Sequence, residues 1–411
     1  MSSNRSTIHF YLFCTGVLLM MVGFLASRAI LSIGMIIVIA NGFLQGGWKE
    51  RVGVFKKDYL LPGITCLFLL PFISGLWSSN QSAWKELMVD MLPLLLLPFA
   101  MARQNGFERK HFLLFNLVWI SLLFAGSLWS AAHYFIDQEN YEALYRLSKT
   151  IPTPAANDHI RFSMAIVIAL LLWLKLEEGK SISSGLLKWS YRIVVAWFVV
   201  YLHLLGAKTG LMGLYLIVLP LFIWQLYHTG RKQLVTAALI AVLCLPLIAY
   251  YSIPTFRIRI QYVLFEQGNW QEKEFAGNFS DVNRLASIKS GWHVFKNNLL
   301  TGVGYGDIKK EAGKWYAANA PEIPSSQQFL PLNQWMFSGS GAGIVAVLLF
   351  TVVALLPFFM KQWRQHKQAL AFVLFMDLVF LYESTINDQF GVFLFCFFIL
   401  YWNLSIRPVK P

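Results

Sequence analysis

The sequence predicts an all-α polytopic membrane protein with about twelve transmembrane helices. Hydrophobic residues make up 57% of its 411 residues and charged residues only 13%, about half the roughly 25% that is usual in soluble domains. Aromatic residues reach 16%, an excess typical of the belts that Trp and Tyr form at membrane interfaces. Apolar runs long enough to cross a bilayer, about 20 residues each, recur along most of the chain. This composition excludes a soluble enzyme, a secreted binding domain and a disordered chain.

The apolar runs define the expected helices in chain order. The first run favours a signal anchor over a cleaved signal peptide, because a second apolar run follows at once without a small-residue cleavage site between them. The pair within 193–227 is the least regular, since the polar stretch 206–210 interrupts it. The expected spans lie near 9–26, 29–45, 59–77, 86–102, 111–135, 160–176, 193–206, 209–227, 233–251, 333–360, 368–385 and 389–405.

Basic residues orient these helices. The net charge is +13, and positively charged cytoplasmic loops explain such an excess in a membrane protein better than nucleic-acid binding does. With the N-terminus inside, the cytoplasmic segments hold 19 Lys or Arg and the short outer loops hold six. We therefore expect a multi-pass protein of the bacterial inner membrane with both termini cytoplasmic. Its parts would be 1–251 with nine transmembrane helices, a large periplasmic loop at 252–332, and 333–411 with three more helices and a short cytoplasmic tail.

The first candidate functional group stands at the outer mouth of the sixth span. Asp158 can cap a helix that begins at His159, just after the helix-breaking run 151–154. His159 and Arg161 then lie in the first turn, where a helix N-terminus with basic side chains can bind an anion. The structural alternative is an Arg that snorkels to the interface, beside a His that ties the loop to the helix.

Lys208, within the polar stretch 206–210, is a second candidate. A lysine between two apolar spans, without an acidic neighbour in sequence, needs a partner from elsewhere in the chain. Its ammonium could contact a phosphate as a point charge. The alternative is a short outer hairpin with one exposed lysine.

The long outer segment supplies a third group. Its stretch 284–295 has the pattern of an amphipathic helix that begins with Arg284 and carries Trp292 and Phe295 near one face. The Gly-x-Gly-x-Gly run at 302–306 lacks the strand, the helix and the Lys-Ser/Thr ending of a phosphate-binding P-loop. A tight loop is therefore the better interpretation of this run.

Two further polar groups lie next to the last spans. Asn333 and Gln334 precede the small-residue run 339–343, whose spacing indicates close helix packing. Glu383 lies in the polar turn 383–389. In the expected topology all five groups face the periplasm, which predicts a cavity there. The four cysteines all fall in apolar runs without a CxxC spacing, so neither a disulfide nor a metal site is expected.

The order of these motifs carries a resemblance to a known family. They are SGLWSSN at 74–80, HIRFS at 159–163, KTG at 208–210, Arg284 upstream of LTGVGYGD at 300–307, Asn333-Gln334 before a Gly-rich helix, and Glu383 before QFG at 389–391. In this order, and over most of its length, the chain resembles the O-antigen ligase and O-antigen polymerase superfamily of bacterial envelope glycosyltransferases. The ligase branch is the closer likeness.

The resemblance implies a GT-C-like architecture and an inverting transfer at the periplasmic face that needs no metal and no other cofactor. The donor would be a glycan on undecaprenyl pyrophosphate, and the acceptor a sugar hydroxyl of lipid A-core, both embedded among membrane lipids. Such a reaction requires cations that neutralise the leaving pyrophosphate and a group that orients or deprotonates the hydroxyl. We expect Arg161, Lys208 and Arg284 to bind the pyrophosphate.

Two residues depart from the family pattern. Lys208 stands where many members have Arg, so the bidentate fork of a guanidinium is lost. Leu332 stands where the family often has a His that is the supposed base. Either His159 or Glu383 then takes the catalytic role, with Asn333 and Gln334 as polar support for the acceptor, or the chain is weakly active or inactive. The alternatives are an O-antigen or exopolysaccharide polymerase, a protein O-oligosaccharyltransferase, and a non-catalytic polysaccharide transport or assembly protein.

Overall fold

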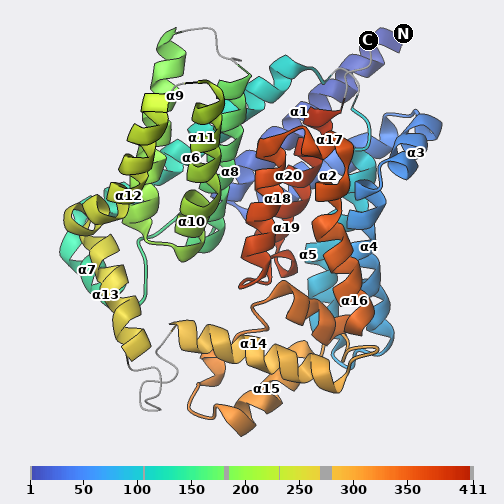
Figure 1. Cartoon of the computed structure of the whole chain (residues 1–411). Coiled ribbons are helices and arrows are strands. Elements are labelled where there is room, and N and C mark those ends of the chain that lie inside the picture. The colour runs from blue at the N-terminus through green and yellow to red at the C-terminus, as the bar shows by residue number, and fades with distance from the viewer. Residues whose placement is uncertain (1, 105–106, 180–184, 231, 269–279, 408–411) are drawn as a thin grey trace.

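The structure is a computed structural model that describes residues 2–104, 107–179, 185–230, 232–268 and 280–407. Every regular element within these residues is a helix, which confirms the expected all-α fold (Figure 1). Residues 269–279 of the expected periplasmic loop and 408–411 of the expected tail lie outside the described residues.

Each expected span coincides with one helix or with a pair of consecutive helices. These helices are α1 (Ser2–Ala26), α2 (Arg28–Leu44), α4 (Leu60–Ile73), α5 (Gln81–Ala100), α6 (Arg109–Ile136), α8 (His159–Glu178), α9 (Gly185–Leu205), α10 (Lys208–Gly213) with α11 (Leu219–His228), α12 (Lys232–Ser252), α16 (Gln334–Phe359), α18 (Lys367–Phe380), and α19 (Gln389–Val392) with α20 (Phe398–Ile406). Outside the expected spans lie α3 (Trp48–Lys57), α7 (Gln138–Arg146), α13 (Pro254–Gly268), α14 (Ser280–Asn297), α15 (Ile308–Asn319) and α17 (Lys361–Arg364).

Eight helices in the described part of the chain are individually long and apolar enough to cross a membrane, which confirms a polytopic membrane protein. The pair α2 and α3 gives a ninth candidate, with a bend of 113° between its two helices. Because α4 and α18 have only 14 residues each, the number of twelve spans stays a prediction. The irregular stretch 206–210 proves to be a short turn at Gly206 and Ala207, so α9 and α10 belong to two different spans.

The helices form a bundle with two distinct ends (Figure 1). Both termini lie at one end, at the top of the view, whereas α14 and α15 lie across the opposite end. The short helix α7 and the helix α13 also lie towards that opposite end. This arrangement agrees with an even number of spans and with a long segment that covers the side away from the termini.

The centre of the bundle is formed by two helices that come from distant parts of the sequence. In the membrane-span windows of α8 and of the α19–α20 pair, 83% of the residues are buried, against 6% for α12. The tight packing of α8 fixes the position of its first turn, which carries His159 and Arg161. α12 therefore lies at the periphery, where its apolar side chains are left for lipid.

The glycine-rich run after α14 docks α14 and α15 onto the bundle. The backbone N–H groups of Val303 and Gly304 donate to the carbonyls of Ser340 and Gly341 at 2.8 and 3.0 Å. Asp307 accepts hydrogen bonds from the backbone N–H groups of Ser79 at 2.5 Å and Asn80 at 3.2 Å. The motifs at 74–80 and 300–307, which both carry the family resemblance, thus contact each other although more than 200 residues separate them in the sequence.

The small-residue run of α16 makes this docking possible. The helix is interrupted at Ala342 and Gly343, where Gly343 adopts φ of 72°. A Cβ atom on Gly343 would come within 2.3 Å of the carbonyl oxygen of Leu300. The N–H of Ile344 donates to the carbonyl of Leu299 at 2.7 Å. Only glycine accommodates both this conformation and this approach, so close packing is the role of the run.

Candidate functional site

Glu383 joins two arginines that come from distant helices. Its side chain is 4% exposed and follows the end of α18. One carboxylate oxygen accepts a hydrogen bond from the guanidinium of Arg284 on α14, and the other lies 3.7 Å from the guanidinium of Arg161 on α8. A buried carboxylate requires such paired charges, because an unpaired charge away from water is strongly destabilising. Three of the seven predicted site residues therefore meet at one point.

Arg161 is enclosed by acidic groups. Its guanidinium donates to the carboxylate of Asp388 at 2.6 Å in addition to its contact with Glu383, and its side chain is only 8% exposed. The carboxylate of Asp158 accepts a hydrogen bond from the backbone N–H of Arg161 at 2.9 Å, so Asp158 caps α8 as expected from the sequence. The charge of Arg161 is thus largely compensated within the protein.

Arg284 and Lys208 are more accessible than Arg161. The side chain of Arg284 is 26% exposed, and its guanidinium also donates to the backbone carbonyl of Tyr382 at 3.3 Å. Lys208 finds the partner that the sequence required: its ammonium donates to Asp281 on α14 at 2.5 Å, with the two side chains 44% and 38% exposed. Both cations therefore border the N-terminal part of α14 with donors left over for a ligand.

The N-terminus of α14 is itself held by a buried acid. The carboxylate of Glu266 accepts hydrogen bonds from the backbone N–H groups of Asp281 at 2.5 Å and Val282 at 3.2 Å. Burial, with the nearby charge of Asp281, raises the pKa of Glu266 above its ordinary value. A carboxylate at this position satisfies the free N–H groups of the helix, so α13 holds the N-terminal part of α14, which carries Asp281 and Arg284.

His159 begins α8 beside the cluster. It is partly buried, and within the described residues no group hydrogen-bonds to its imidazole. Three positively charged side chains act electrostatically on its ring, namely Arg259, Arg284 and Arg161. A histidine that tied the loop to the helix would show a hydrogen bond from its ring to that loop. No such hydrogen bond occurs within the described residues, and the role of the ring stays a prediction.

Asn333 and Gln334 support the loop that carries Glu383. The side chain of Asn333 caps α16 by accepting from the N–H of Met336 at 3.0 Å, and it donates to the carbonyl of Leu381 at 2.7 Å. Gln334 accepts from the backbone N–H of Ile386 at 3.1 Å. Both amides therefore fix the segment on either side of Glu383.

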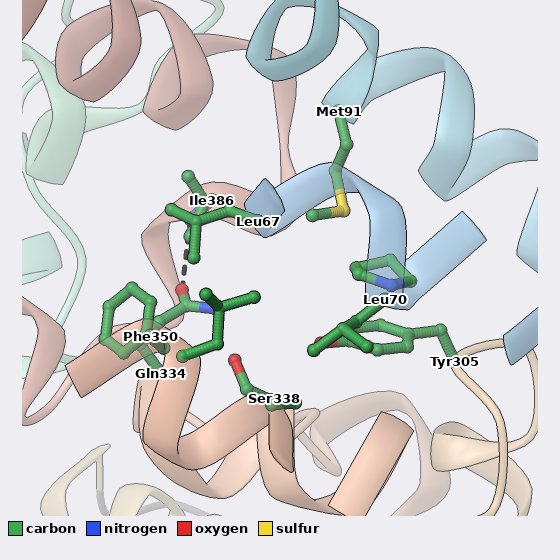
Figure 2. A pocket seen from close by; sticks show the side chains of 11 residues that line it. Leu67, Leu70, Met91, Tyr305, Gln334, Ser338, Phe350 and Ile386 are labelled. Atoms are coloured by element: carbon green, nitrogen blue, oxygen red, sulfur yellow. Dashed lines mark hydrogen bonds between the residues drawn. The ribbon is translucent and has the colours of Figure 1, made fainter. Parts of the chain in front are cut away.

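Gln334 also lines a small pocket inside the bundle (Figure 2). Most of the side chains around it are apolar, including Leu67, Met91 and Phe350, and Tyr305 and Ser338 provide its other polar edges. The hydrogen bond of Gln334 to Ile386 crosses one side of this pocket in Figure 2. Gln334 therefore lines a mostly apolar pocket and contacts the segment that carries Glu383 through the backbone of Ile386.

Three residues of the cluster were not predicted from the sequence. Arg259 on α13 is buried and donates to the carbonyl of Gly206 at 3.4 Å and to Ser148 at 3.0 Å; burial lowers its pKa. Asp388 holds Arg161, and the hydroxyl of Tyr382 is buried without a hydrogen-bond partner in the described residues. The sequence signal for Asp388 was its place in the polar turn 383–389, whereas Arg259 had none beyond its charge.

The Gly-x-Gly-x-Gly run does not provide a phosphate cradle. The N–H groups of Val303 and Gly304 bond to α16, and those of Tyr305 and Gly306 bond to the hydroxyls of Ser74 and Ser78 at 3.3 and 3.2 Å. A phosphate-binding loop must point such groups at its ligand. The tight-loop interpretation is therefore the right one.

The fold and the cluster define a multi-pass helical membrane protein with a charged site at the end of the bundle away from its termini. Residues 193–336 match the family model described as O-antigen ligase, and this match confirms the resemblance to the O-antigen ligase superfamily. A search of curated proteins finds no match. The match indicates a membrane protein with a glycosyltransferase-like function. It includes Lys208, Arg284, Asn333 and Gln334.

Proposed function

We propose that the chain transfers a glycan from undecaprenyl pyrophosphate to a sugar hydroxyl of lipid A-core, as a ligase of the bacterial inner membrane. The observation that carries this proposal is the meeting of Arg161, Arg284 and Glu383 beside His159. Both termini would be cytoplasmic and the cluster periplasmic. The chain would divide into membrane helices at 1–251, a periplasmic segment at 252–332, and membrane helices with a short tail at 333–411.

The cations suit the leaving group of this reaction. The acceptor hydroxyl forms a bond to the anomeric carbon while the bond from that carbon to the pyrophosphate breaks, so negative charge grows on the leaving oxygen. Cationic donors in a partly desolvated site stabilise such charge strongly. Arg284 and Lys208 are the accessible donors, and release of Lys208 from its half-exposed pair with Asp281 costs little, on the order of 0–1 kcal/mol.

Arg161 takes a different part in this proposal. Because Asp388 and Glu383 already neutralise its guanidinium, it contributes to the field at the pyrophosphate mainly by holding the carboxylate of Glu383. Glu383 in turn orients the guanidinium of Arg284. This arrangement keeps the donors fixed before the substrate arrives, which is the condition for efficient electrostatic catalysis.

His159 is the better acceptor for the proton of the hydroxyl. Protonation of Glu383 would remove the partner of two guanidiniums at once, and that cost opposes its use as a base. Among the described residues, the imidazole of His159 has no hydrogen-bond partner to lose. In our proposal His159 accepts the proton in place of the histidine that Leu332 replaces, while Asn333 and Gln334 hold the Glu383 segment.

Deletion of the encoding gene in the host tests the proposal and its rivals. A ligase predicts lipopolysaccharide without long glycan, together with carrier-linked polymer that accumulates. A polymerase predicts lipid that carries a single glycan repeat, and a protein O-oligosaccharyltransferase predicts loss of glycan from protein alone. Normal lipopolysaccharide in the deletion strain would overturn the proposal. Restoration by the wild-type chain, but not by an Arg284→Ala chain, assigns the effect to the cluster.

A further inference from the structure

A groove lies between α14 and α15, apart from the charged cluster. It has a volume of about 250 Å³, just below the roughly 300–1,000 Å³ that is typical of small-ligand sites. Its lining includes His293 and Asn297 from α14, Asn298 directly after that helix, and Trp315 and Asn319 from α15. All of these residues belong to the described part of the long segment.

The groove faces away from the charged cluster. Arg284 and His293 are nine residues apart on α14, which is two and a half turns at 3.6 residues per turn. The two side chains therefore project from opposite sides of the helix. Arg284 reaches towards Glu383 in the bundle, whereas His293 lines the groove beside α15. A ligand shared by both sites would have to extend past α14.

The chemistry of the lining suits a neutral, hydroxyl-rich ligand. The amide of Asn298 donates to the carbonyl of Val294 at 2.9 Å, and that of Asn319 donates to the carbonyl of Trp315 at 3.0 Å. Within the described residues, the side-chain oxygens of both asparagines are left without a donor. Amide oxygens accept hydrogen bonds from hydroxyl groups, so the groove presents acceptors where a sugar presents donors.

The charges of the groove cancel, and an aromatic ring lines it. Glu311 and Lys314 pair with each other at 2.7 Å, so no net charge favours an anion or a cation. Trp315 is partly exposed in the groove. A Trp ring offers a flat apolar surface next to polar groups, which fits the C–H face of a pyranose ring. Few protein partners would match so small a polar hollow.

We propose that this groove binds the glycan chain of the donor, at a sugar residue distant from the pyrophosphate. The inference depends on the proposed function for the identity of that chain. A polymer is required because a ligand that starts at Arg284 must pass around α14 to reach Trp315. The groove would then favour donors whose glycan is long enough to pass around α14.

Direct binding tests the groove without any transfer reaction. The probe is the host O-polysaccharide, released from its lipid by mild acid and titrated calorimetrically into the purified full-length protein in detergent. Trp315→Ala should weaken binding at least about tenfold, equivalent to ~1.4 kcal/mol, and Asn319→Ala, which removes one of the free amide oxygens, should weaken it about threefold. The matched control is Trp292→Ala, which removes an exposed Trp of α14 that does not line the groove. Its affinity should equal that of the wild type.

The binding measurements test the groove independently of the proposed ligase activity. No binding by the wild type, or equal binding by the Trp315→Ala, Asn319→Ala and Trp292→Ala proteins, would overturn the inference. Preferential binding of released core oligosaccharide would overturn its assignment to the donor. Binding that depends on Trp315 in a protein that transfers no glycan would instead contradict the proposed function and leave the groove intact.

Discussion

Neutralisation of Glu383 is the most informative single change in the cluster. Glu383→Gln keeps the shape of the side chain but removes the charge that holds Arg161 and Arg284 together. At the 3.7 Å separation from Arg161, and with an effective dielectric constant of about 20, the lost attraction is roughly 4 kcal/mol before desolvation is counted. Arg161 retains Asp388 at 2.6 Å, and Arg284, which is 26% exposed, can be rehydrated. We therefore expect a net loss of stability of about 1–3 kcal/mol.

The functional effect should be far larger than the effect on stability. Without its carboxylate partner, Arg284 loses the orientation that directs it at the leaving group, and transfer should fall by about 100-fold or more. Transfer is measured with purified protein, carrier-linked glycan and lipid A-core, next to the thermal denaturation of each variant. Asp388→Asn is the matched control: it removes the other charge on Arg161 but keeps an acceptor for the N–H of Gly391. It should lose stability but retain most transfer. Transfer by Glu383→Gln within twofold of the wild type would refute this reasoning.

The remaining predictions concern the cations, the candidate base and the helix cap. Arg284→Ala should abolish transfer, and Lys208→Ala should reduce it at least about tenfold. The lysine variant should change stability by less than about 1 kcal/mol, because its ion pair is half-exposed. Normal membrane insertion of both variants is the control, and normal transfer by both would contradict the site. His159→Gln should lower turnover, because Gln keeps the hydrogen bonding of the ring but cannot accept a proton near neutrality, whereas wild-type turnover would exclude the base role. Burial raises the pKa of Asp158, so the wild type should lose stability as pH rises above the ordinary Asp range. Asp158→Asn keeps the cap and avoids that loss, and its denaturation midpoint should therefore match the wild type near about pH 4 and exceed it near about pH 7.5.

The fold could be predicted because it depends on local properties of the chain. A run of about 20 apolar residues is sufficient to predict a membrane helix, and Asp158 caps α8 through a contact only three residues away. The helix 284–295 is confirmed within α14 for the same reason. The count of spans is less secure, since α4 and α18 have 14 residues each.

The contacts within the candidate site could not be predicted from the sequence. Glu383 and Arg284 are 99 residues apart, and Arg161 and Asp388 are 227 residues apart. No periodicity relates such positions, so charges that cancel in the folded protein look independent in the sequence. Arg161 illustrates this: its place in the first turn of α8 suggested an anion site, but the folded chain surrounds it with carboxylates.

The motifs that carry the family resemblance have different roles in the folded protein. The runs at 74–80 and 300–307 were noted for the resemblance, and the structure brings them together as a structural contact through Asp307 and Ser78. Lys208 and Arg284 instead keep accessible cationic groups. A motif that marks a family can therefore mark how an outer segment is held rather than what it binds.

Reconstitution of the reaction tests the central claim most directly. The purified full-length protein is mixed with glycan-linked undecaprenyl pyrophosphate and lipid A-core, and the lipids are separated after incubation. The account predicts a lipid A-core that carries the glycan, release of undecaprenyl pyrophosphate in equal amount, and neither product with the Arg284→Ala protein. Intact donor in the presence of correctly folded wild-type protein, or equal transfer by the Arg284→Ala protein, would contradict it.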